Sequence, residues 1–278
     1  MLRLNPAALG ACATRAAHPA PPGRADRIVF VVVAALLFAA SAIATLGGCA
    51  SMAAHAQPMP GGWMLSMAAM AMCGDGAPGA LFAFVPMWTA MMVAMMSPAL
   101  APALWRYRAA LERAGAAAHA NRRAAAVALG YFAVWSALGF VVLALAAVAG
   151  DALLQRPAWS RAVPAIAGTV VMSAGAWQFG AWKRHRLACW RAALRGGDAD
   201  GASAAWQRGV RLGLHCNAAC ANLTAVLLAL GAMDLRVMAL ATAAITAERL
   251  APRAARIAEG IGIVLVGAGA FMIGQAAA

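Results

Sequence analysis

The stretch from Ile28 to Gly47 reads IVFVVVAALLFAASAIATLG, twenty residues without a charge. A helix rises about 1.5 Å per residue, so such a run covers the ~30 Å hydrocarbon core of a bilayer. The rest of the chain has the same character, because 64% of its 278 residues are hydrophobic and 11% are charged. These proportions predict an all-α, polytopic transmembrane helical bundle.

Further apolar segments follow toward the C-terminus, at residues 80–105, 124–149, 162–182, 209–232 and 257–276. Between the last two lies Leu235 to Ala247, whose 13 residues are typical of a re-entrant or interfacial piece. We expect about seven spans, or six if Leu235 to Ala247 is re-entrant. Small residues in the last segment favour helix association, namely Gly260, Gly262, Gly267, Gly269 and Gly274.

Positive charge is distributed unequally between the two faces of this predicted bundle. With seven crossings, all Lys and Arg lie on one face except Arg156, Arg161 and Arg236. The populated face should be cytoplasmic, which predicts an inner-membrane protein of a bacterium with its N-terminus inside and its C-terminus outside. On this scheme Lys183 belongs to a cytoplasmic loop and Arg249 to the cytoplasmic face. Glu248, which ends the sixth segment, and Asp234, at the outer turn, lie at the membrane interface with ordinary helix-end roles.

Residues 1–26 mix Arg, Pro, Ala and His without periodicity and predict a disordered cytoplasmic tail before a transmembrane domain over 27–278. A cleaved signal peptide is the competing interpretation, because the residues before Cys49 resemble a lipoprotein cleavage site; the apolar run and its leader are both unusually long for one. The net charge of +13 is explained by orientation in the bilayer. No nucleic-acid partner is expected, since the basic clusters lack aromatic platforms.

A run of methionines stands out in the second apolar segment, where residues 87–98 read MWTAMMVAMMSP. Leucine would suit lipid equally well, so burial alone does not explain the thioethers. Thioether sulfur either fills irregular gaps or binds a soft metal such as Cu(I). Helical spacing places Met87, Met91 and Met95 on one stripe, with Met92 and Met96 on the adjoining one.

Two cysteines, Cys216 and Cys220, share one face of the fifth segment because they are four residues apart. Cysteine is also a common buried apolar residue, so packing is the competing interpretation. The second and fifth segments run in opposite directions, which puts Met95 and Met96 at the height of the cysteines. We therefore predict a soft-metal site with thiolate ligands Cys216 and Cys220, thioether ligands Met91, Met95 and Met96, and His215 near its cytoplasmic mouth.

A second group of soft side chains lies in the loop after the first segment. A metal-capture surface on the outer side could be formed there by Met52, His55, Met59, Met64 and Met67. Met64 and Met67 also follow helical spacing, so an amphipathic helix on the membrane surface is the alternative. No carboxylate pair, Ser-His-Asp arrangement, phosphate loop or His-Glu-x-x-His run is present, and we expect no catalytic residues and no enzyme activity.

Three stretches resemble a bacterial family of predicted metal-binding integral membrane proteins, domain-of-unknown-function family 2182. They are Met87 to Pro98, Trp177-Gln178 with Lys183 to Cys189, and His215 to Glu248. The resemblance extends over about residues 28–277 and implies a metal site. The family pattern has two adjacent cysteines in the fifth segment followed by Leu-Met. Here Ala219 replaces the first cysteine and Thr224 the methionine, which implies an altered site.

The leading hypothesis is a protein that binds a soft transition metal, most plausibly Cu(I), for transport or for delivery to or from a partner protein. Two alternatives stay open. One is a metal-free structural or assembly subunit of the membrane, in which the methionines pack. The other is a thiol-redox protein acting through Cys216 and Cys220, which their helical spacing and the lack of a Cys-x-x-Cys pair disfavour.

Overall fold

The computed structural model describes residues 24–53, 57–59, 63–65, 76–195, 201–232 and 234–277. Its helices are α1 (Arg24–Ala53), α3 (Gly76–Arg113), α4 (Ala117–Gln155), α5 (Pro157–Trp177), α6 (Ala181–Arg195), α7 (Gly201–Leu230), α8 (Leu235–Leu250) and α9 (Ala254–Ala277). Strands β1 (Gln57–Met59) and β2 (Trp63–Leu65) form a short antiparallel hairpin with Pro58 opposite Met64. The all-α prediction is confirmed, with this hairpin as an addition. Residues 1–23, most of the expected tail, lie outside the described residues.

Five of the described helices contain segments long and apolar enough to cross a membrane: Arg24–Cys49, Phe84–Arg113, Ala117–Ala149, Gly201–Leu230 and Ala254–Ala277. A sixth crossing is formed if α5 and α6, which are bent by 67° at a short break, count as one span. Helix α8 has 16 residues, about 24 Å, which is short of a full crossing. These six candidates are the predicted segments other than Leu235 to Ala247, which lies in α8.

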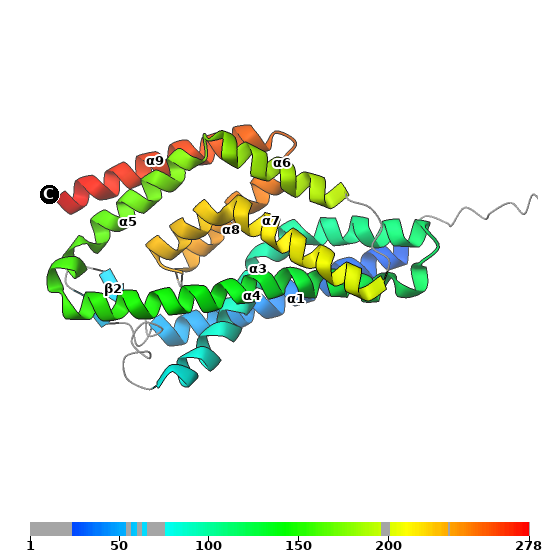
Figure 1. The fold of residues 1–278 in the computed structure, drawn as a ribbon, viewed down its shortest axis with the longest axis horizontal. Coiled ribbons are helices and arrows are strands. Elements are labelled where there is room, and N and C mark those ends of the chain that lie inside the picture. The colour runs from blue at the N-terminus through cyan, green and yellow to red at the C-terminus, as the bar shows by residue number, and fades with distance from the viewer. Residues whose placement is uncertain are drawn as a thin grey trace, which may run out of the picture.

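Helix α8 nevertheless reverses the direction of the chain. It begins at Asp234, whose side chain accepts hydrogen bonds from the amides of Arg236 (2.7 Å) and Val237 (3.2 Å), so the helix-end role expected near this turn is confirmed for Asp234. Figure 1 shows α7 and α9 pointing the same way, with the C-terminus and the beginning of α1 at opposite ends of the long axis.

Glycines let α4 and α7 pack against each other in parallel. A Cβ on Gly209 would collide with the Val127 carbonyl, and a Cβ on Gly213 would lie 2.9 Å from the Tyr131 carbonyl oxygen. From Gly209 to Gly213 the contact moves four residues along α7, and it moves four residues in the same direction along α4, from Val127 to Tyr131. The two helices are therefore parallel. Because no hydrophobic effect draws helices together in lipid, small residues that permit close backbone approach carry much of their association.

The pair α5 and α9 uses the same device in antiparallel orientation. A Cβ on Gly262 would lie 3.0 Å from the Gly175 carbonyl oxygen, and one on Gly168 would lie 3.1 Å from that of Gly269. The expected packing role is confirmed for Gly262 and Gly269. The other three glycines of α9 face open space, namely Gly260, Gly267 and Gly274.

We predict that Gly209→Ala lowers the free energy of unfolding by about 1–3 kcal/mol, because the added methyl group forces α4 and α7 apart. The control is Gly267→Ala, where no atom lies within 4 Å of the new Cβ. It should be neutral or stabilising, since alanine is the better helix former. Unfolding in a denaturing detergent titration measures both, and equal losses would contradict the packing role of Gly209.

Candidate metal site

The two cysteines of α7 lie in the interior of the bundle. Cys216 and Cys220 are both fully buried, at 0% exposure, and both are free thiols. The Cys220 thiol donates to the Cys216 carbonyl oxygen at 3.0 Å. The Cys216 sulfur accepts a hydrogen bond from the Tyr131 hydroxyl at 2.9 Å. The close packing at Gly213 brings α4 near enough for this contact.

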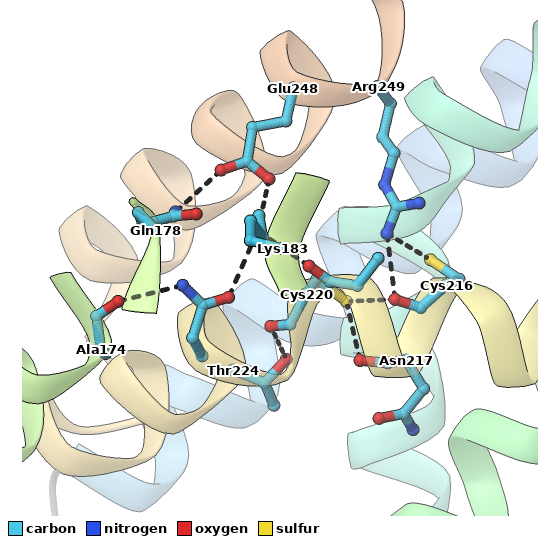
Figure 2. Close-up of polar contacts among 11 residues, drawn as sticks. Ala174, Gln178, Lys183, Cys216, Asn217, Cys220, Thr224, Glu248 and Arg249 are labelled. Carbon is cyan, nitrogen blue, oxygen red and sulfur yellow. Dashed lines mark hydrogen bonds and ion pairs between the residues drawn. The ribbon is translucent and has the colours of Figure 1, made fainter. Parts of the chain in front are cut away.

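A cation from α8 reaches the same sulfur. The Arg249 guanidinium donates to the Cys216 carbonyl oxygen at 2.9 Å and lies 3.4 Å from its Sγ. The guanidinium also stacks 4.4 Å above the ring of Trp190 on α6. Two donors therefore converge on one sulfur from different helices, an arrangement that favours negative charge on that sulfur. Figure 2 shows Arg249 descending onto Cys216 from the end of its helix.

The methionines of α3 belong to the same buried cluster as the two cysteines. Met91, Met92, Met95 and Met96 have at most 2% exposure, and all four share this cluster with Cys216 and Cys220. Helices α3 and α7 are joined through α4 and α8, each of which packs against both. The predicted sulfur residues thus share one buried cluster, while their role as ligands stays a prediction. His215 differs from its neighbour Cys216 in being partly exposed.

The proposed outer capture residues are only partly described. Met52 lies near the end of α1, and Met59 and Met64 lie in the paired strands of the hairpin. The helical interpretation of Met64 is wrong, because residues 63–65 pair as a strand. His55 and Met67 lie outside the described residues.

A buried ion pair adjoins the cysteines. The Lys183 ammonium of α6 contacts the Glu248 carboxylate of α8 at 2.8 Å, and the two side chains are 0% and 1% exposed. Lys183 also donates to the Ala219 carbonyl oxygen at 2.8 Å and to Asn222 Oδ1 at 3.3 Å. Charges inside a membrane are costly and are found paired, so this network fixes α6, α7 and α8 relative to one another.

The network continues to the break between α5 and α6. Gln178 Nε2 donates to the second Glu248 oxygen at 2.8 Å, and Asn222 Nδ2 donates to the Ala174 carbonyl oxygen at 3.1 Å. These contacts form a continuous path from Ala174 through Asn222 and Lys183 to Glu248. Figure 2 shows Lys183 between α7 and the Glu248 carboxylate. The 67° bend aims Lys183 at α7 and α8.

The assignment of Lys183 to a loop is wrong, because it lies within α6, and Glu248 and the adjacent Arg249 have more than ordinary helix-end roles. All three are buried and hydrogen-bonded across helices. The positive-inside rule counts charges near segment ends, and it cannot separate a loop charge from one that folds inward. The sequence signal that points to this network is Asn222, because a polar side chain inside an apolar segment needs a hydrogen-bonding partner on another helix.

The described residues contain no group of three or more His, Cys, Asp or Glu side chains placed to hold a metal ion. A metal held by Cys216 and Cys220 would therefore draw its remaining ligands from thioethers. Soft thiolate and thioether donors together suit Cu(I) rather than a hard cation. Cys216, Cys220 and the α3 methionines of the same buried cluster are donors of this kind.

Residues 85–272 match the model of the PpoB2 family, which is described as a copper chaperone. The chain belongs to this family. The match covers well over half of the chain and includes the methionine run, Lys183, both cysteines of α7 and the Glu248–Arg249 pair. It supports a copper-related membrane family, while the number 2182 remains a resemblance. No curated protein and no solved structure matches the chain.

We predict that Lys183→Met destabilises the fold by about 3–5 kcal/mol, because it leaves the Glu248 carboxylate buried without a counter-charge. The double variant Lys183→Met/Glu248→Leu should recover most of this loss. Arg184→Met is the matched control, since Arg184 lies next along α6 but is exposed. Thermal unfolding of these proteins, together with Glu248→Leu alone, measures the coupling. Additive effects of the two substitutions would show that the ion pair is not the cause.

Proposed function

We propose that this chain binds Cu(I) inside the bundle, between the cysteines of α7 and the methionines of α3, and delivers it to a partner protein. The observation that carries the proposal is the burial of Cys216 and Cys220 in one cluster with the four α3 methionines. Membership of a family described as a copper chaperone supports it. Leucine would pack in such a cluster without offering a metal ligand.

The charges around the site favour a monovalent ion. Lys183 and Glu248 neutralise each other, which leaves the buried Arg249 cation against the Cys216 sulfur. Two thiolates and one Cu(I) carry a net charge of −1, which balances Arg249. A divalent ion on the same two thiolates would leave an uncompensated positive charge in the low-dielectric interior, where it is costly.

The thioethers of α3 supply neutral ligands that a copper ion can exchange. They extend from Met96 through Met91 to Met87, which is partly buried and approaches α1, where a Cβ on Gly48 would lie 2.8 Å from the Met87 sulfur. A neutral sulfur binds Cu(I) without adding charge, so an ion can move along such a stripe and settle at the anionic cysteines. The stripe therefore suits uptake near Met87 and storage at the cysteines.

The setting we propose is the bacterial inner membrane with the N-terminus inside, as the distribution of Lys and Arg indicates. Thiol-redox activity is less well supported, because a disulfide between two residues four apart on one regular helix is geometrically awkward, and both cysteines are free thiols. A purely structural role would account for burial of the methionines and leaves the convergence of Tyr131 and Arg249 on Cys216 without a use.

The first test is copper content. Purified, reduced protein in mild detergent should retain about one Cu(I) per chain against a competing chelator, and Cys216→Ser/Cys220→Ser should retain none. The control Cys12→Ser/Cys189→Ser removes two cysteines elsewhere and should bind as the wild type does. X-ray absorption should give copper–sulfur distances of about 2.3 Å, as for other metal–thiolate bonds. Equal copper in the wild type and the Cys216/Cys220 variant would refute the site.

A second test separates ligation by methionine from packing. Met95→Leu/Met96→Leu should weaken Cu(I) binding roughly tenfold or more, although the change conserves volume and costs under about 1.5 kcal/mol of stability. The matched control is Met172→Leu/Met272→Leu, on the α5–α9 pair away from the cysteines. Competition titration measures the affinities. Unchanged affinity in the Met95/Met96 variant would assign these thioethers to packing alone.

A further inference from the structure

A groove of about 510 Å³ lies between α1 and α3, away from the cysteines. It is lined on the α1 side by Arg27, Phe30, Val31, Ala34, Ala35 and Phe38, and on the α3 side by residues between Ser97 and Arg106. Its walls are apolar except for Ser97 and the two arginines. A volume of this size is typical of sites that hold a ligand.

The two arginines lie at the same end of the groove. Helices α1 and α3 are antiparallel, since Asp26 meets Arg108 at 3.5 Å and the ring of Phe30 lies 5.3 Å from that of Trp105. Eleven residues of α1 separate Arg27 from Phe38, so the groove extends about 16 Å from its charged end into the apolar region. That depth matches much of one leaflet of a ~30 Å hydrocarbon core.

Small residues and prolines make the groove. Ala34 and Ala35 line its α1 wall, and Pro98, Ala101 and Pro102 line its α3 wall. Proline has no amide hydrogen, so carbonyls of the preceding turn lose their helical partners. Pro98 leaves the Ala94 carbonyl oxygen without its helical amide, and Ser97 Oγ donates to that oxygen at 3.4 Å instead. The groove wall therefore has no unpaired carbonyl at Ala94.

The charges at the open end are uncompensated. The nearby carboxylates of Asp26 and Glu112 are both taken by Arg108, at 3.5 and 2.9 Å. Within the described residues, neither Arg27 nor Arg106 forms an ion pair. Two exposed guanidiniums thus stand at the mouth of an apolar slot, where they complement an anion attached to a hydrocarbon chain.

We propose that this groove binds an anionic phospholipid, with one acyl chain between α1 and α3 and its headgroup phosphate between Arg27 and Arg106. Guanidinium groups bind phosphate through paired hydrogen bonds, and basic pockets between transmembrane helices on the cytoplasmic side bind anionic headgroups. By the charge distribution of the chain, this end of the groove is the cytoplasmic one. The proposal does not depend on copper binding.

Native mass spectrometry of the full chain tests the proposal, with phosphatidylglycerol and phosphatidylcholine of identical acyl chains as probes. The wild type should retain one phosphatidylglycerol at roughly thirtyfold higher affinity than phosphatidylcholine, as expected for two arginines near the headgroup. Arg27→Gln/Arg106→Gln should abolish this preference. The control Arg113→Gln/Arg122→Gln removes two exposed arginines near the same end of α3 and should keep it.

A second variant tests the slot itself. Ala34→Phe/Ala101→Phe fills the groove from both walls and should abolish retention of phosphatidylglycerol while both arginines remain. Two results would overturn the proposal. One is equal retention of the two lipids by the wild type. The other is no retained lipid at all, which is expected if residues 1–23 or a second copy of the chain cover the groove.

Discussion

The ion pair between Lys183 and Glu248 is the contact on which the rest of the interior depends. Each charge would be prohibitive alone at 0% and 1% exposure, so the two side chains have to meet. Lys183 comes from α6 and Glu248 from α8, and the carbonyl oxygen of Ala219 on α7 completes the junction. The 67° bend between α5 and α6 is compatible with this contact, because Lys183 lies just after the bend and reaches both α7 and α8. One electrostatic requirement thus sets the positions of three helices.

The same ion pair also positions a cation beside the Cys216 sulfur. Arg249 follows Glu248 directly in the sequence, so anchoring Glu248 to Lys183 delivers the guanidinium to the Cys216 sulfur. Tyr131 reaches the same sulfur from α4, a helix held close by glycines. The thiol pair therefore adjoins the charge network and belongs to the same buried cluster as the α3 methionines. Stability and proposed metal binding share residues that are neighbours in the chain.

The sequence predicted the features that depend on composition and periodicity. Apolar segments, the gathering of Met95 and Cys220 in one buried cluster, and the packing glycines Gly262 and Gly269 follow from segment length, direction and small-residue spacing. The burial of Lys183 could not be predicted in this way, because its partner Glu248 lies on α8 and an ion pair between distant helices leaves no local sequence pattern. The α1–α3 groove could not be predicted from the sequence either, because it depends on Pro98 and Pro102 lying on the face of α3 that meets α1.

The parallel contact of α4 with α7 has a consequence for biogenesis. Two parallel spans cannot be adjacent in the chain, so α5 and α6 must be inserted before α7 can dock on α4. Lys183 is then inserted while Glu248 is still to be synthesised. During that interval the Lys183 ammonium lacks the ion-pair partner that it has in the finished protein. The Lys183–Glu248 ion pair can form only after α8 has been inserted. Completion of the native bundle therefore depends on the C-terminal part of the chain.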